Sequence, residues 1–156
     1  MRLKLLAGLA LPILIVAPSI ARAQTSDRDA VLATTQKVFD AMRTRDTLLL
    51  LSAFDTTGRL VGVSRAGAIG LTAPSRFGAA FSSAPAGTVW NERMYDPEVR
   101  VDGNVAQVWG YYTFHLNDKF SHCGIDAFML VKGAAGWKIT QLADSRRTEG
   151  CTHTTP

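Results

Sequence analysis

The second half of the chain constrains the fold most, because it alternates strand-like segments with strong turn signals. Asp102-Gly103 is a preferred two-residue hairpin turn, and the stretches 117–119 and 133–136 provide two more turns. The segments between these turns are dense in Val, Ile, Trp, Tyr and Phe, which favour strands. They span residues 89–101, 105–116, 120–132 and 137–147. The pattern predicts a four-stranded antiparallel meander.

Helical periodicity dominates the segment before these strands. Ser26-Asp27 places a cap and an acidic side chain where a helix N-terminus favours them, Asp46 can cap a second helix, and Pro74 suits a first helical turn. The predicted elements are helices at 27–45, 47–54 and 74–83 and a strand at 59–64. Two or three helices followed by strands predict an α+β domain, with the helices covering one face of a curved, mainly antiparallel sheet.

The first 23 residues have the composition of a cleavable secretory signal. Arg2 and Lys4 precede an apolar run, and Ala21-Arg22-Ala23 offers the small-x-small end that signal peptidase recognises. The apolar run is shorter than the roughly 20 residues that span a bilayer, so an uncleaved membrane anchor is the weaker alternative. We therefore expect a periplasmic or secreted protein without stable membrane insertion after cleavage.

Removing this segment changes the charge of the chain. The whole chain has 17 Lys and Arg against 13 Asp and Glu, and three of the 17 basic residues lie within residues 1–23, so the net charge falls from +4 to +1. No concentrated basic stripe remains, which argues against a nucleic-acid partner. The predicted organisation is a signal peptide at 1–23, one domain at 24–150 and a short, loose tail at 151–156.

Two cysteines, Cys123 and Cys151, remain after the signal is removed. In an oxidising compartment an even pair predicts a disulfide. The alternative is a zinc site, because His122 and His153 lie near the two cysteines, although the spacings match no familiar finger or ribbon. We expect the disulfide and no metal, and no cofactor fingerprint is present in the sequence.

Strand parity predicts which polar side chains share a face of the sheet. Alternation along the strands places Tyr112, His122, Asp126, Gln141 and Arg147 on one largely apolar face. Asp126 is the anomaly there, because a carboxylate among apolar groups is costly unless it is paired. It is the best candidate for a catalytic or ligand-accepting residue; the alternative is a structural carboxylate that accepts hydrogen bonds from Arg147 or from backbone amides.

The opening amphipathic helix, the strand VWGYYTFHL at 108–116 and the segment GWKI at 136–139 resemble the nuclear transport factor two-like superfamily. That superfamily includes SnoaL-like polyketide cyclases and ketosteroid isomerase-like domains. The resemblance implies a cone-shaped α+β barrel in which a bent sheet wraps around helices and leaves a pocket. It also implies a homodimer through the outer sheet face, on which parity places Trp109 and Tyr111. No catalytic motif of the superfamily can be placed on this sequence.

Three functions stay open at this point, because members of the superfamily include enzymes, ligand binders and dimerisation modules. The first is an exported domain that binds a small apolar or aromatic ligand. The second is a protein-interaction or dimerisation module with a vestigial pocket. The third is an isomerase- or cyclase-like enzyme that uses Asp126 for proton transfer.

Overall fold

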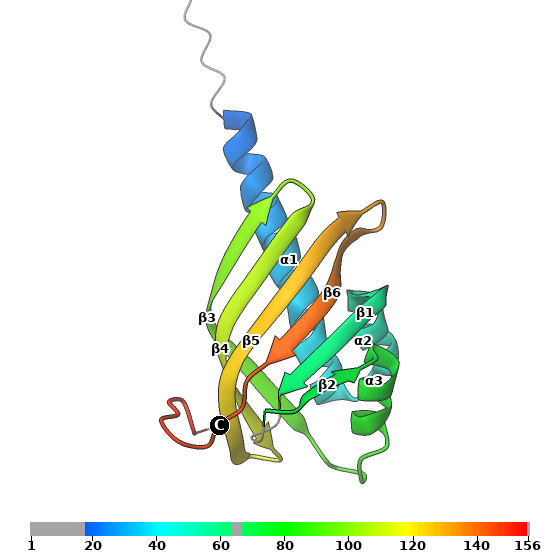
Figure 1. The fold of residues 1–156 in the computed structure, drawn as a ribbon, viewed down its shortest axis with the longest axis vertical. Coiled ribbons are helices and arrows are strands. Elements are labelled where there is room, and N and C mark those ends of the chain that lie inside the picture. Colours follow the sequence, from blue (N-terminus) through cyan, green and yellow to red (C-terminus); the bar gives the residue numbers. More distant parts are fainter. Residues whose placement is uncertain (1–17, 64–66, 156) are drawn as a thin grey trace, which may run out of the picture.

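A computed structural model describes residues 18–63 and 67–155 of the chain. Within these residues three helices pack against a six-stranded mixed sheet that curves around them (Figure 1). The helices are α1 (Pro18–Thr44), α2 (Thr47–Ala53) and α3 (Pro74–Ser82). The strands are β1 (Phe54–Val63), β2 (Ile69–Thr72), β3 (Trp90–Asp102), β4 (Val105–Leu116), β5 (Lys119–Gly133) and β6 (Gly136–Asp144). The predicted α+β class and curved sheet are confirmed.

The strands follow the order β2-β1-β6-β5-β4-β3, so the predicted meander forms one side of the sheet. The strand β1 extends this sheet by pairing parallel to β6, and β2 pairs antiparallel to β1 at the edge. Prediction from the sequence missed β2, because this short strand lies in a Gly- and Ala-rich stretch with little strand signal. The sheet is therefore mixed, although most of its pairs are antiparallel.

The long helix α1 runs behind the meander in Figure 1 and contacts β3, β4 and β6. It buries the apolar stripe predicted from the sequence, which includes Val31, Val38, Phe39 and Met42. The helix begins at Pro18, earlier than predicted, so residues 18–23 of the predicted signal peptide are helical. The remainder of the signal peptide, residues 1–17, lies outside the described residues. In the described part of the chain, no helix is long and apolar enough to cross a membrane.

Polar contacts of the two residues between α1 and α2 define the start of α2 and the position of α3. The Asp46 carboxylate accepts a hydrogen bond of 2.9 Å from the Leu49 amide, as expected of the predicted N-cap. The Arg45 guanidinium donates to the carbonyl oxygens of Phe81 and Ser82 at 3.2 and 2.6 Å, at the C-terminal end of α3. Cationic donors are favoured at such an end, where carbonyl groups lack helical partners. These contacts fix α3 beside α2 and β1.

An irregularity in the pairing of β5 with β6 decides which β6 side chains face the helices. Met129 pairs with Gln141, whereas the next residue, Leu130, pairs with Ile139. Thr140 is therefore an extra residue in β6, as in a β-bulge. Because side chains alternate along a strand, one extra residue reverses the parity of every β6 residue after it.

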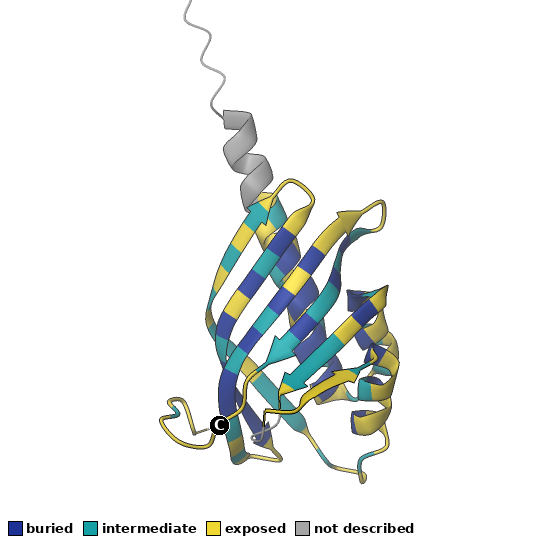
Figure 2. Cartoon of the chain, viewed as in Figure 1, coloured by how far each residue is buried: buried dark blue, intermediate teal, exposed yellow. Residues whose placement is uncertain are grey.

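The core lies between α1 and the inner face of the sheet. Buried and exposed residues alternate along β4 and β5, as Figure 2 shows. The edge of the Phe39 ring packs against Phe128, with the ring centroids 6.1 Å apart. The other fully buried side chains of this core include Val108, Tyr112, Leu130 and Ile139. This packing supplies a rigid frame on which the polar residues of the inner face are held.

The C-terminal segment folds back along β5 and is covalently fixed there. Cys123 and Cys151 form the predicted disulfide, so neither thiolate remains for a zinc ion and the zinc alternative is wrong. The backbones of Cys123 and Arg147 also exchange two hydrogen bonds of 2.9 Å. In the chain-entropy model a disulfide between residues 28 apart stabilises the fold by roughly 3–4 kcal/mol.

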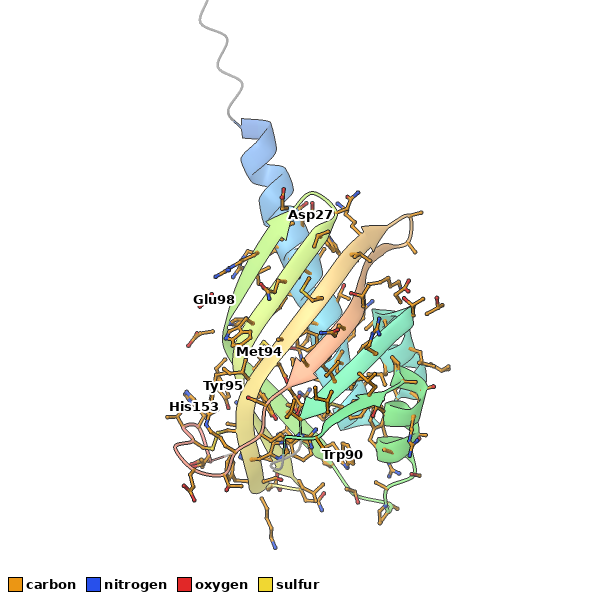
Figure 3. All side chains as sticks on the ribbon, viewed as in Figure 1. Asp27, Trp90, Met94, Tyr95, Glu98 and His153 are labelled. Carbon is orange, nitrogen blue, oxygen red and sulfur yellow. A yellow bond between two sulfur atoms is a disulfide. The ribbon has the colours of Figure 1, made fainter. Side chains whose placement is uncertain are left out.

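Beyond the disulfide the tail is anchored to the outer face of the sheet, contrary to the prediction that it is loose. The His153 ring stacks on Tyr95 with centroids 4.1 Å apart, and Figure 3 shows the two side chains together. The Tyr111 hydroxyl accepts a hydrogen bond from the Thr152 amide at 2.8 Å. The His115 ring lies 3.1 Å from the Thr154 carbonyl oxygen. Aromatic side chains on β3 and β4 thus hold the described part of the tail against the outer face of the sheet.

Candidate functional site

Two adjoining cavities open at the end of the sheet near α3. The smaller, of 180 Å³, is lined by Met42, Phe77, Trp90, Glu92, Phe114, Leu116, His122 and Arg146. The larger, of 490 Å³, is lined by Val63, Ser121, His122, Ser145, Arg146, Arg147 and Thr148. Both contain His122 and Arg146, so these two residues stand where the cavities meet. Most residues that line the smaller cavity are apolar, and most that line the larger one have polar side chains.

Aromatic side chains from three elements form the apolar wall of the smaller cavity. The edge of Trp90 on β3 packs against Phe114 on β4, with centroids 5.8 Å apart. Phe77 on α3 packs against the same indole at 6.2 Å. Such edge-to-face contacts are the preferred geometry for aromatic pairs. The wall is thus held by ring contacts between α3 and the sheet.

The polar group inside this apolar wall is Glu92. It lies two residues from Trp90 along β3, so both side chains project from the same face. Behind it, Asp126 on β5 is 1% exposed and does not border either cavity. The two carboxyl groups are hydrogen bonded to each other. A carboxyl pair can make such a bond only when one partner carries a proton.

Burial and mutual repulsion keep protons on this carboxyl pair. Burial, the charge of Glu92 and the charge of Asp144 raise the pKa of Asp126 well above its usual range. Burial first, and then the charge of Asp144, raise the pKa of Glu92 to about 8, although Arg146 opposes the shift. Among the described residues no hydrogen-bond donor reaches the buried Oδ2 of Asp126. The floor of the site is therefore a proton-sharing pair rather than two carboxylates.

Arg146 provides the positive charge at the junction of the cavities. Its Nε donates to Asp144 Oδ2, yet its side chain is 60% exposed. Burial works against the charged form, but the hydrogen bond and charge of Asp144 outweigh this and raise the pKa of Arg146. The guanidinium thus stays charged, and among the described residues only its Nε has a hydrogen-bond partner, Asp144.

His122 borders both cavities as a neutral side chain. Burial, and then the nearby charge of Arg146, lower its pKa below the usual value. Its Nδ1 lies 3.0 Å from the Ser121 hydroxyl, and its ring rests against Phe114 with centroids 5.0 Å apart. A neutral imidazole at this position can accept or donate one hydrogen bond.

Tyr112 fixes the segment that carries Arg146. Its hydroxyl donates to the Ser145 carbonyl at 3.0 Å, and its ring is buried. Burial, followed by the negative charges of Glu92 and Asp126, raises the pKa of this phenol, so it stays a donor. Gly124 lies opposite Tyr112 in the pairing of β4 with β5, and a Cβ there would sit 1.8 Å from the same Ser145 carbonyl oxygen. A side chain at position 124 has no room.

The structure brings Tyr112, His122 and Asp126 together, and the predicted Arg147 borders the larger cavity from the outer side, but the predicted Gln141 lies elsewhere. Gln141 pairs with Met129 and faces the outer side of the sheet. The Arg147 guanidinium lies 5.7 Å from the Tyr111 ring on that side, although Arg147 also borders the larger cavity. The extra residue Thr140 is the reason, since it turns Asp144 and Arg146 inward in place of Ala143 and Arg147. For the same reason Asp126 pairs with Asp144, whereas a regular strand without the extra residue would pair it with Ala143.

Prediction from the sequence missed Glu92 and Arg146. A signal for Glu92 was present, since it alternates with Trp90 and Met94 on β3 and these flank it on the same face. Arg146 carried no such signal, because an extra residue inside a strand leaves no clear mark in the sequence. Within the described residues no cluster of His, Cys, Asp or Glu is placed to hold a metal ion.

No protein-family model and no curated protein match this sequence. Solved structures do match the fold. An NTF2-like protein with a cystatin-like fold from Novosphingobium aromaticivorans has a TM-score of 0.69 and 12% identity, covering 92% of this chain and 96% of its own. A candidate dehydratase of the NTF2-like family from Streptomyces avermitilis has a TM-score of 0.64 and 16% identity, covering 80% and 99%. An NTF2-like protein of unknown function from Shewanella baltica has a TM-score of 0.64 and 11% identity, covering 80% and 97%.

Proposed function

We propose that the joined cavities bind a small, partly apolar molecule whose polar group is held by Glu92. The chain has the nuclear transport factor 2-like fold that its sequence resembles, and this fold hosts unlike activities, so its function depends on the residues of the site. The observation that carries the proposal is a carboxyl group that keeps a proton near neutral pH on the wall of a cavity lined mainly by apolar side chains. Such a convergence of apolar lining and one perturbed polar group is typical of ligand sites.

In this proposal Asp126 acts through Glu92 and does not touch the ligand. Asp126 is buried behind Glu92 and is hydrogen bonded to it, so it controls where the shared proton lies. With the proton on Glu92, the cavity offers a donor; with the proton on Asp126, it offers an acceptor. The pair can therefore serve ligand hydroxyl, carbonyl or carboxyl groups. A purely structural carboxylate would instead be paired with a cation or with backbone amides.

A thermal-shift screen of residues 24–156 against small apolar and aromatic compounds tests the proposal. We expect at least one compound to stabilise the protein, and saturation at 100 times Kd corresponds to about 2.7 kcal/mol. For a domain of this size that is a rise in Tm on the order of 8 °C. Glu92→Gln should abolish most of this rise. Glu98→Gln, an exposed glutamate on the same strand, should leave the rise unchanged.

Two outcomes would contradict the proposal. One is a cooperatively melting wild-type protein that no compound stabilises, which would favour the interaction module with a vestigial pocket. The other is a hit that stabilises Glu92→Gln as strongly as the wild type, because such a compound binds without the group that defines the site.

Proton-transfer catalysis is a second candidate function, favoured by the pairing of Glu92 with His122. Both side chains border the smaller cavity, the first with a raised pKa and the second with a lowered one. Near neutral pH the raised pKa keeps a proton on Glu92 and the lowered pKa leaves His122 without its second proton, so the first suits a general acid and the second a general base. One structural neighbour is a candidate dehydratase of the NTF2-like family. Chemical conversion of a screened compound, followed by NMR in the same mixtures, would favour this function over binding alone.

We further propose that the protein works outside the cytoplasm as a homodimer. The disulfide is compatible with an oxidising compartment. Trp109 is 48% exposed on the outer face and lies near the exposed Val105, Met129 and Val131, which pairing of two copies would cover. Native mass spectrometry of the exported protein should show two copies of residues 24–156, each with the disulfide intact. A chain that begins at Met1, or a monomer at micromolar concentration, would contradict the respective half of this proposal.

A further inference from the structure

We propose that the ligand of this site is a ring-bearing organic acid, with its apolar ring in the smaller cavity and its carboxylate against Arg146. This inference rests on the proposed binding function of the cavities and names the chemical class of the ligand. It follows from three features of the site: the size of the apolar cavity, the unused donors of Arg146, and the absence of acidic side chains around the larger cavity within the described residues.

The smaller cavity has the size and lining for one ring. Its volume is 180 Å³, and an apolar protein cavity of about 150 Å³ accepts a benzene molecule. Trp90, Phe77 and Phe114 line it and already contact one another edge to face. A further aromatic or alicyclic ring would continue this cluster. A bare polar ion would leave these surfaces unused.

Arg146 has hydrogen-bonding capacity that the protein itself does not use. A guanidinium carries five N–H donors in a fork that matches a carboxylate. Only Nε is engaged, by Asp144, and among the described residues no other acceptor binds this side chain. Because Arg146 borders both cavities, a carboxylate on a ring in the smaller one can reach it. Asp144 meanwhile holds the guanidinium in place from the protein side.

The charges around the site favour an anion over a neutral or cationic ligand. The larger cavity is bordered by Arg146, Arg147 and the neutral His122, with hydroxyl groups from serine and threonine side chains. Glu92 would repel an anion if it were ionised, but burial raises its pKa, so near neutral pH it carries a proton. In that form it can donate to the second oxygen of a ligand carboxylate. A ligand ammonium group would instead face the guanidinium.

Matched acid and amide pairs test this inference at pH 7 and low salt. We would titrate the wild-type protein with benzoate, cyclohexanecarboxylate and 3-phenylpropionate, and with the amide of each, by calorimetry. At least one acid should bind about tenfold or more tightly than its own amide, since a charge-assisted hydrogen bond is lost in the amide. Arg146→Gln should remove this preference while leaving amide binding within about twofold. Arg100→Gln, an exposed arginine on β3 that pairs with Glu98 and borders neither cavity, should keep the preference.

The outcomes separate this inference from the function on which it rests. If amides bind as tightly as acids, the organic-acid inference fails while the proposed binding function stands. If Arg146→Gln keeps the acid preference in full, Arg146 is not the carboxylate partner and the inference fails as stated. If neither acids, amides nor the broad panel bind to a folded wild-type protein, both proposals fail together. Circular dichroism of each variant confirms folding before its binding is interpreted.

Discussion

Between about pH 5 and pH 9 the wild-type protein is expected to lose stability as pH rises, because folding holds protons on Glu92 and Asp126. The pKa of Glu92 is 4.5 in an ordinary environment and is raised to about 8 in the folded protein. Between these values the folded state binds more protons than the unfolded state, so the free energy of unfolding falls as pH increases. The loss of stability is complete above the pKa that Glu92 has in the folded protein. For this shift the free energy of unfolding falls by something on the order of 3–5 kcal/mol.

The charged and titratable groups around the pair come from every strand of the meander. Asp144 and Arg146 at the end of β6 act in opposite directions on Glu92, and Tyr112 on β4 and His122 on β5 border the same space. Asp144 and Arg146 are paired with each other, so their opposing effects partly cancel. Burial of both carboxyl groups, together with the charge of Glu92 acting on Asp126, therefore remains the main cause of the pH dependence.

Asp126→Asn is the variant that isolates this effect. Its amide keeps the volume of the buried side chain, does not titrate, and can donate a hydrogen bond to an ionised Glu92. We expect a flatter pH profile and a variant more stable than the wild type at about pH 9. Urea unfolding at a series of pH values measures both, and Asp118→Asn in the exposed turn after β4 serves as the control. A wild-type stability that is constant or rises over this range would show that the pair is not proton-sharing.

The turns determined how well the meander could be predicted. The hairpin at Asp102-Gly103 allowed β4 to be placed at Val105–Leu116, the bounds that the structure has. The turn after β4 predicted that Gly110 pairs with Asp126, which the register confirms. Next to the turn the pairing is shifted by one residue, so that Leu116 pairs with Lys119, and an irregularity between Phe114 and His115 restores the predicted register further along the strands. Burial of Asp126 on the inner face followed from this pairing.

Features that arise from tertiary contacts could not be predicted in this way. Because of the extra residue Thr140, Arg146 and not Arg147 faces the inner side of the sheet, and nothing in the alternation of β6 indicated this extra residue. The carboxyl pair forms between residues on β3 and β5, which are separated by β4, so only the curvature of the sheet brings Glu92 to Asp126. The parity of β3 was enough to place Glu92 on the inner face, but not to give its partner.

Gly124→Ala is expected to destabilise the protein more than a typical substitution, by about 3 kcal/mol or more. The added Cβ would lie 1.8 Å from the Ser145 carbonyl oxygen and 2.8 Å from the Tyr112 ring. Ser145 cannot move away easily, because its amide donates to the Ile125 carbonyl at 3.0 Å and its hydroxyl accepts from the Ile125 amide at 3.0 Å. The clash must therefore push the segment that follows β6 away from β5, and Arg146 lies on that segment.

Gly133→Ala, at the other end of the same strand, is the matched control for this prediction. No heavy atom lies within 4 Å of a Cβ added there, and the backbone does not require glycine, so the change should be neutral or stabilise by about 0.4–1 kcal/mol. Urea unfolding compares the two variants, and binding of the screened ligand reports the state of the site. If Gly124→Ala unfolds at the same urea concentration as Gly133→Ala, then Ser145 does not press on β5.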